Sequence, residues 1–208
     1  MGGHDPYSSS KGCAELITSA YRRSYFLKID NPTQGVAVAT TRAGNVIGGG
    51  DWATDRLVPD IMKAIMEDRS VIIRYPNAIR PWQHVLEPLR GYMTLAEKLV
   101  NDGDGYDEGW NFGPDRSDER PVVDVAEALA AALGQGKINL AAQQPELHEA
   151  NILRLDSSKA HGRLEWRPAL DFDKTIEMTA QWYGAWANGA QAKDLCRSQI
   201  SDYMAISS

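Results

Sequence analysis

A long helix followed by an apolar strand is the feature that most constrains the fold. Apolar residues at helical spacing predict a helix over residues 7–30, and Asn31-Pro32 stops it. The following run, residues 36–41, is continuous, apolar and rich in β-branched side chains, as in a buried parallel strand. The polar residues Arg42 and Asn45 come next, and ligands of open α/β sheets bind at such carboxyl ends.

Later segments continue to alternate between helical and strand patterns. Helices are predicted over residues 57–66, 87–100, 122–133, 157–164 and 172–188. Strands are predicted over residues 71–75, 137–139 and 152–156, with a short strand and a turn over 110–114. The aspartate- and glycine-rich stretch 101–109 is predicted to be an exposed loop, and the last twenty residues are expected to be poorly anchored.

The composition excludes several classes of protein. A net charge of -6 without a basic stripe argues against binding to nucleic acid. No apolar run approaches the roughly 18 residues that cross a bilayer, so no membrane association is indicated and a cytoplasmic location is expected. Cys13 and Cys196 lack metal-type spacing and are interpreted as free thiols. His84 and Glu87 have no third ligand nearby, so no metal site is predicted.

Tyr7 and Lys11 form the candidate chemical motif. Residues four apart share one helix face with about 6 Å of axial rise, which brings the ammonium close to the phenol. A phenol beside a cation is suited to accept a proton from a sugar or alcohol hydroxyl at neutral pH. The spacing by itself is a weak signal, because it also describes an ordinary surface pair at a helix start.

Three longer segments supply the context that this pair needs. They read Asp5-Pro6-Tyr7-Ser-Ser-Ser-Lys11, Arg42-Ala43-Gly44-Asn45-Val-Ile-Gly-Gly-Gly-Asp-Trp52 and Arg80-Pro-Trp-Gln-His-Val-Leu-Glu-Pro88. Together they resemble the extended short-chain dehydrogenases/reductases, which include the NAD-dependent epimerases and dehydratases of nucleotide sugars. The likeness is strongest to the CDP-glucose 4,6-dehydratases, and Gly-Gly-Gly-Asp-Trp is one of its most specific parts.

The resemblance implies an α/β fold, namely the C-terminal portion of an extended Rossmann-type short-chain dehydrogenase. NAD is the implied cofactor, but the sequence has no strand followed by a glycine-rich turn of the dinucleotide-binding type. The N-terminal dinucleotide-binding strands are therefore expected to be missing, and NAD binding by the chain alone is expected to be weak or absent. Residues 1–50 are expected to be a remnant of the Rossmann domain, with the catalytic helix and the following strand. Residues 51–190 are expected to be mainly a substrate-binding α/β portion with some returning Rossmann elements, and 191–208 a C-terminal tail.

The resemblance also implies roles for residues on the cofactor side. Tyr7 is the implied catalytic base, and Lys11 holds the nicotinamide ribose while its charge favours loss of the phenol proton. Both residues are therefore assigned to catalysis and to cofactor binding. The backbone at Ala43 and Gly44 is expected to pass along the nicotinamide.

On the substrate side, Asn45 is expected to bind the diphosphate-sugar, and Arg80 to hold a substrate phosphate through its planar guanidinium. Arg56 is expected at a helix start, facing the same diphosphate, and His148-Glu149 in a loop that contacts the base or a sugar hydroxyl. The alternatives are a turn asparagine, a solvated surface arginine and an ordinary loop pair. The tryptophans at 52 and 82 are candidates to line the pocket.

The implied activity is that of a lyase, the NAD-dependent conversion of CDP-glucose to CDP-4-keto-6-deoxyglucose, in deoxysugar and polysaccharide biosynthesis. This activity belongs to the full-length parent, and the chain alone is expected to be inactive. In the resembled family the equivalent of the helix at 7–30 packs in a dimer, so a homodimer is expected. Two other functions stay open, a non-catalytic module for nucleotide-sugar binding or assembly and a related nucleotide-sugar epimerase.

Overall fold

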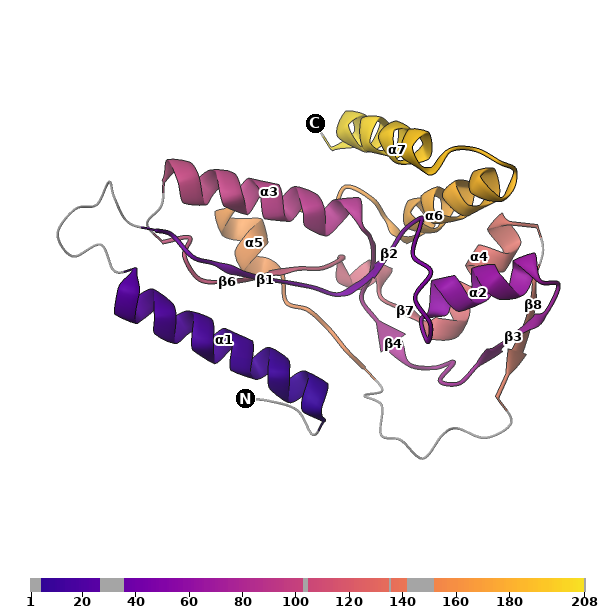
Figure 1. The fold of residues 1–208 in the computed structure, drawn as a ribbon, viewed down its shortest axis with the longest axis horizontal. Coiled ribbons are helices and arrows are strands. Elements are labelled where there is room, and N and C mark those ends of the chain that lie inside the picture. Colours follow the sequence, from indigo (N-terminus) through magenta and orange to yellow (C-terminus); the bar gives the residue numbers. More distant parts are fainter. Residues whose placement is uncertain (1–4, 27–35, 103–104, 135, 142–151, 208) are drawn as a thin grey trace. The chain divides into compact units, whose positions relative to one another are not determined.

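In the computed structural model, the chain is described over residues 5–26, 36–102, 105–134, 136–141 and 152–207. It forms two compact units, each built from separate stretches of sequence (Figure 1). Unit 1 comprises residues 1–42, 90–112 and 157–166, and unit 2 comprises residues 43–89, 113–156 and 167–208. Helices and short strands alternate through both units, so the predicted α/β class is confirmed.

Unit 1 contains the N-terminal helix and a pair of strands. Its elements are α1 (Pro6–Tyr25), β1 (Thr40–Ala43, except its last residue), the larger part of α3 (Leu86–Asn101), β6 (Gly109–Phe112) and α5 (Ser158–Arg163). Strand β1 pairs with β6. In Figure 1 these two strands run between α1 and α3.

Helix α1 begins as its sequence predicts. The Asp5 side chain caps it by accepting a hydrogen bond from the backbone N–H of Ser8 at 2.9 Å, and Pro6 occupies the first turn, where no N–H is needed. The helix ends at Tyr25, earlier than the predicted residue 30, and residues 27–35 lie outside the described ones. No residue of α1 is buried.

The strand after α1 differs from its prediction. It begins at Thr40 instead of residue 36, and Val36 is 58% exposed, so the expectation of a buried strand over 36–41 is wrong. Within the described residues β1 has a hydrogen-bonded neighbour on one edge only, which is β6. An apolar run indicates which residues favour a strand, but it does not indicate how many neighbours cover them.

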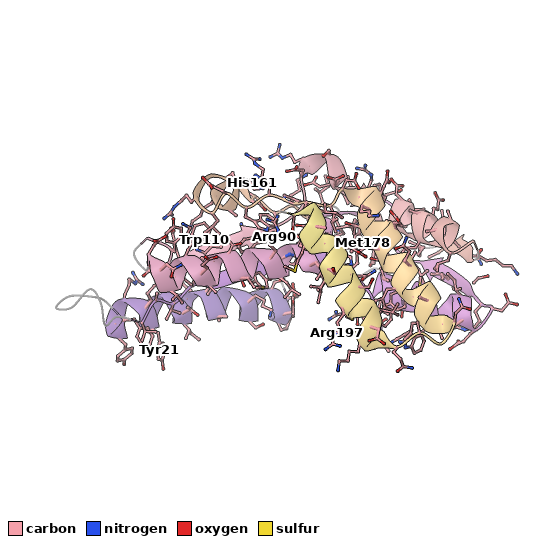
Figure 2. All side chains as sticks on the ribbon, turned by 90° about the horizontal axis from the view of Figure 1, so that it is seen from above. Tyr21, Arg90, Trp110, His161, Met178 and Arg197 are labelled. Carbon is pink, nitrogen blue, oxygen red and sulfur yellow. The ribbon has the colours of Figure 1, made fainter. Side chains whose placement is uncertain are left out.

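The core of unit 1 is aromatic. Trp110, Phe112 and Trp166 are almost completely buried and pack with Leu95 of α3. At Gly91 an added Cβ would lie 2.3 Å from a ring carbon of Phe112, so only glycine lets α3 approach β6 this closely. Figure 2 shows Trp110 between α3 and α5 in a view from above.

The described residues of unit 2 form three strand pairs and four complete helices. β2 (Asn45–Ile47) pairs in parallel with β5 (Trp82–His84), and β3 (Ser70–Ile73) pairs in parallel with β8 (Lys137–Leu140). β4 (Ile79–Arg80) pairs antiparallel with β7 (Arg120–Pro121). The helices are α2 (Leu57–Met66), α4 (Val122–Ala132), α6 (Phe172–Ala187) and α7 (Ala192–Ile206), with a short 3₁₀ turn, η1, at Arg116–Asp118.

Most helices lie within one or two residues of their predicted bounds, because their apolar faces pack into the core. The strand predicted over 152–156 is wrong. Only Ile152 forms an isolated bridge, to Ile79, and the backbone N–H of Leu153 donates to the Ile79 carbonyl. Among the described residues, no helix is long and apolar enough to cross a membrane.

The triple-glycine segment packs directly against α6. At Gly49 an added Cβ would lie 2.0 Å from the indole ring of Trp182, so no larger side chain fits without movement of one of them. Tyr183 Oη donates a hydrogen bond to the Asp51 carbonyl at 2.7 Å, and Trp52 packs on the Tyr183 ring at 5.3 Å between centroids. Residues about 130 positions apart therefore determine the path of this segment together.

The C-terminal helix is anchored by a buried carboxylate. Glu87 Oε1 accepts hydrogen bonds from the backbone N–H groups of Ala169 and Leu170, at 2.9 and 2.8 Å. Its other oxygen accepts one from Tyr203 Oη at 2.8 Å, and Tyr203 is buried. The Gln199 side chain of α7 also donates to the Met178 carbonyl of α6 at 2.6 Å. The expectation of a poorly anchored C-terminal end is therefore wrong, because no sequence pattern indicates these distant partners.

His84 is a buried neutral base in β5. It is 1% exposed, and burial lowers its pKa to about 4. The backbone N–H of Leu86 donates to Nδ1 at 3.4 Å, which assigns the ring proton to Nε2. Within the described residues Nε2 has no hydrogen-bond partner.

We predict that His84 makes the stability of the chain depend on pH. Between about pH 6.5 and 4 the unfolded histidine binds a proton that the folded one does not, so the free energy of unfolding falls as the pH falls through this window. The full effect is roughly 3 kcal/mol. Urea unfolding at several pH values, followed by tryptophan fluorescence, measures it.

His84→Gln should flatten this dependence between pH 6.5 and 5, whatever its effect on stability at neutral pH. His161→Gln is the matched control, because it removes a histidine at another position. Equal flattening in the two variants would contradict the assignment to His84.

Candidate functional site

Tyr7 and Lys11 lie side by side on the first turns of α1. The Lys11 ammonium nitrogen is 5.4 Å from the centroid of the Tyr7 ring, so the four-residue spacing brings the two groups together as predicted. The Tyr7 side chain is 71% exposed, which leaves its phenol open to a ligand. This geometry places the ring of Tyr7, whose hydroxyl is the candidate proton acceptor, near a positive charge.

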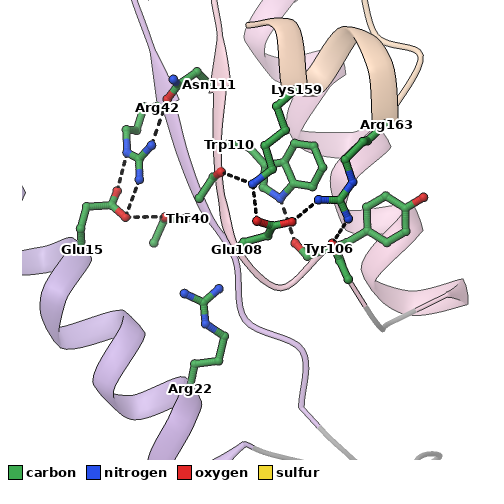
Figure 3. A network of polar contacts seen from close by, with 12 residues as sticks. Glu15, Arg22, Thr40, Arg42, Tyr106, Glu108, Trp110, Asn111, Lys159 and Arg163 are labelled. Carbon is green, nitrogen blue, oxygen red and sulfur yellow. Dashed lines mark hydrogen bonds and ion pairs between the residues drawn. The ribbon is translucent and has the colours of Figure 1, made fainter. Parts of the chain in front are cut away.

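A network of polar contacts holds the middle of the same helix (Figure 3). The Glu15 carboxylate accepts hydrogen bonds from Arg42 Nε at 2.7 Å and from Thr40 Oγ1 at 2.8 Å. Arg42 Nη1 also donates to the Asn111 side-chain oxygen at 3.0 Å. The hydrogen bond from Arg42 is the main reason that the pKa of Glu15 is lowered, although partial burial opposes it.

In unit 2 the stretch Ala43–Asn45 runs beside residues 80–82. Asn45 begins β2 and lies opposite Trp82 in the parallel pairing with β5. At Gly44 an added Cβ would lie 2.7 Å from the Pro81 carbonyl oxygen, so glycine is needed for this close approach. Strand pairing therefore brings Asn45 next to the segment that carries Arg80, which supports placing both on one substrate side.

Arg80 lies within β4 instead of after a strand. It is 6% exposed and pairs with Arg120 of β7, so two guanidinium groups come from neighbouring backbone positions. Its Nη1 donates to the carbonyl of Ile79 at 2.9 Å. Arg120 donates to the carbonyl of Glu119 at 3.1 Å and lies over the Phe172 ring.

Arg56 occupies the N-cap position of α2, at a helix start as its position in the sequence predicts, and its side chain makes no capping hydrogen bond. It forms an ion pair with Asp51 at 3.2 Å, and its side chain is 65% exposed.

The two tryptophans proposed to line a pocket are both packed against other residues of the core. Trp52 meets the Tyr183 ring of α6 edge to face and the Trp186 ring at a tilt, and the indole N–H of Trp82 donates to the Arg120 carbonyl at 3.1 Å.

His148 and Glu149 lie outside the described residues. The remaining candidates are divided between the units, since Tyr7 and Lys11 belong to unit 1, and Ala43 to Asn45, Arg56 and Arg80 belong to unit 2. Among the described residues, no three His, Cys, Asp or Glu side chains gather in a way that could hold a metal ion.

The residues present fit one end of a dinucleotide. Lys11 and Tyr7 offer an ammonium and a hydroxyl on an exposed helix face, which are suitable partners for ribose hydroxyls. The described strand-to-helix connections contain no glycine-rich turn of the kind that receives a pyrophosphate. The fit is therefore to the nicotinamide ribose.

The sequence patterns missed Glu15 and Arg42 as partners. Glu15 continues the four-residue spacing of Tyr7 and Lys11, which is the one signal that marks it. Its partner is 27 positions away, and no periodic pattern indicates such a pair.

Comparison with known proteins finds relatives of the kind that the sequence resembles. The chain is 46% identical over 204 residues to the CDP-glucose 4,6-dehydratase of Salmonella typhimurium, covering 98% of this chain and 57% of that protein. It is 26% identical over 183 residues to a dTDP-glucose 4,6-dehydratase of an Actinoplanes species, covering 88% of this chain and 52% of that protein. No model of a known protein family matches the chain.

Among solved structures, a dTDP-glucose 4,6-dehydratase from Bacillus anthracis in complex with NAD matches with a TM-score of 0.69 and 23% identity. The match covers 94% of this chain and 56% of the other, and at this identity it shows the fold alone. The chain spans about half the length of the curated relatives that it matches. The resemblance stated from the sequence is confirmed.

Proposed function

We propose, from its membership of the extended short-chain dehydrogenases/reductases, that this chain supplies the proton-accepting pair and the nucleotide-sugar side of an NAD-dependent CDP-glucose 4,6-dehydratase. The contact that carries the proposal is the Lys11 ammonium 5.4 Å from the Tyr7 ring centroid on an exposed helix face. The 46% identity to the Salmonella enzyme supports CDP-glucose as the nucleotide sugar. The activity itself belongs to a protein about twice as long.

Tyr7 accepts the proton of the sugar 4-hydroxyl in the proposed reaction. Bound NAD supplies the acceptor for the hydride that leaves the same carbon. Lys11 stabilises the phenolate that has lost its own proton, because an ammonium beside it offsets the negative charge. The same ammonium donates hydrogen bonds to the ribose, so one residue links cofactor position to base strength.

The substrate diphosphate is assigned to unit 2. Arg80 and Arg56 supply guanidinium groups that suit phosphate oxygens, and Asn45 supplies an amide beside the Arg80 segment. Asp51 forms an ion pair with Arg56, which keeps this exposed arginine near the helix start. His148 and Glu149 remain assigned to the base or to a sugar hydroxyl. A cytoplasmic location also stays a prediction.

Two other functions predict different products from the assembled enzyme. An epimerase would release the inverted sugar instead of a 4-keto-6-deoxy sugar, and the solved epimerases share only the fold at 18–19% identity. A non-catalytic binding module would bind the nucleotide sugar and form neither product. The higher identity to a dehydratase supports the first assignment.

We predict that Tyr7→Phe abolishes the activity of the assembled enzyme. The chain is joined to the part of the Salmonella dehydratase that it does not match, and formation of the 4-keto sugar from CDP-glucose is measured by its alkaline absorbance. Phenylalanine keeps the ring but lacks the oxygen that accepts the proton, so the rate should fall roughly 10²–10⁴-fold. Lys11→Ala should also weaken NAD binding.

Tyr25→Phe is the matched control, because Tyr25 lies on the same helix and is 73% exposed, against 71% for Tyr7. Its rate should match that of the unmutated enzyme. If the Tyr7→Phe enzyme forms keto sugar equally fast, the catalytic assignment is wrong.

The exposed apolar residues of α1 predict a homodimer. Leu16, Ile17 and Tyr21 are each more than half exposed, and Figure 2 shows Tyr21 projecting from the outer side of the helix. Ile17→Glu should shift the chain toward monomer in light scattering, because burial of a charge opposes association. Ile72→Glu is the control, since Ile72 is 65% exposed but lies on β3. A monodisperse monomer of the unmutated chain at high concentration would refute the homodimer.

A further inference from the structure

Helix α1 carries the candidate base but has little apolar anchorage. None of its residues is buried, and Tyr7 and Lys11 occupy its first two turns. Within the described residues, the polar contacts from α1 to the rest of unit 1 include those of two side chains. They are Glu15, which meets β1, and Arg22, whose Nη1 donates to the Val38 carbonyl at a long 3.4 Å. Glu15 makes the shorter of these contacts, so it constrains the direction in which the helix presents its residues.

Three side chains, Thr40, Arg42 and Asn111, take part in the contacts that hold Glu15. Two nitrogens of Arg42 meet the two carboxylate oxygens of Glu15, each at 2.7 Å, so the pair is bidentate and fixes orientation as well as distance. Thr40 donates a third hydrogen bond to the carboxylate, and Asn111 of β6 accepts one from Arg42. Figure 3 shows these contacts joining α1, β1 and β6.

The backbone leaves space for this guanidinium. At Gly109 an added Cβ would lie 2.4 Å from Arg42 Nη2, so any larger residue there would displace the arginine. The Arg42 side chain is 44% exposed and that of Glu15 29%, which places the pair at the surface but partly out of water. Hydrogen bonding to Arg42 is the main cause of the lowered pKa of Glu15, so the carboxylate stays charged at neutral pH.

Glu15 shares a helix side with the candidate base. Tyr7, Lys11 and Glu15 follow each other at intervals of four, so each is turned by only about 40° from the one before. Fixing Glu15 therefore fixes the direction in which the other two point. A rotation of about 10° moves a group that lies about 6 Å from the helix axis by about 1 Å, and an error of this size is enough to slow catalysis strongly.

We propose that Glu15 is a positioning residue, which acts through its bidentate pair with Arg42 to hold α1 at the angle that presents Tyr7 and Lys11 to substrate and cofactor. The inference rests on the proposed function, because it assigns Glu15 a role in the same reaction. Glu15 itself touches neither reactant. Its effect should appear in the rate of the chemical step and in the order of the helix.

The first experiment measures the helix in the chain itself. Hydrogen exchange of backbone amides, followed by mass spectrometry of peptides, is compared for the unmutated chain, Glu15→Gln and Glu177→Gln. Glu177 is a matched control, because it also pairs with a cation, Lys174 at 2.8 Å, but lies on α6. The rate of amide hydrogen exchange over residues 7–20 should rise at least several-fold in Glu15→Gln and should not change in Glu177→Gln. Unchanged exchange there would overturn the proposal.

The second experiment measures turnover in the assembled enzyme. Glu15→Gln and Arg42→Lys should each lower kcat roughly 10- to 10²-fold while KM for CDP-glucose stays within about two-fold, because the substrate contacts are unaltered. The exchanged pair Glu15→Arg with Arg42→Glu should recover a large part of kcat, since it restores an ion pair between the same elements. A fall in kcat with no change in hydrogen exchange, or equal losses in Glu177→Gln, would overturn a positioning role.

The two proposals fail in different ways. If Tyr7→Phe leaves the assembled enzyme fully active, the proposed function is wrong, and Glu15 cannot be positioning a base. If Tyr7→Phe abolishes activity but Glu15→Gln does not lower kcat, the proposed function stands and the role of Glu15 is wrong. Loss of kcat in Tyr7→Phe and in Glu15→Gln, with recovery in the exchanged pair, supports both proposals.

Discussion

The buried carboxylate of Glu87 is the interaction on which much of unit 2 depends. Burial of a charge is costly unless donors replace the lost water, and here two backbone N–H groups and the Tyr203 hydroxyl do so. These donors come from the segment before α6 and from α7. One side chain at the start of α3 thus fixes where α6 begins and how α7 lies against it.

The helices could be predicted well because their signals are local. A cap such as Asp5 and the apolar spacing of residues 57–66 lie within a single element, and packing reinforces what they favour. The strands were less predictable. Their placement depends on partners, as at 36–41, where the apolar run extends beyond the residues that pair with β6, and at 152–156, where only Ile152 forms a bridge.

The candidate site shows the same distinction. Tyr7 and Lys11 meet because helix geometry alone brings residues four apart together. The neighbourhood of Asn45 and Arg80 required the pairing of β2 with β5, which a single sequence does not reveal. Arg42 was recognised only as a polar residue after a strand, since its bond to Glu15 joins side chains from elements that no periodicity connects. Resemblance to a family supplied roles for these residues, and the structure supplied their contacts.

The division of unit 1 into three stretches has a consequence for its synthesis. Trp110 and Phe112 complete their core only with Ala160, Leu164 and Trp166, whereas α1 is finished at Tyr25. About 140 residues separate these events, which at roughly 5–20 residues per second is a delay of about 7 to 28 s on the ribosome. The helix with the candidate base is therefore synthesised well before this core can form, and Glu15 can meet Arg42 before Asn111 of β6 is available to hold the arginine.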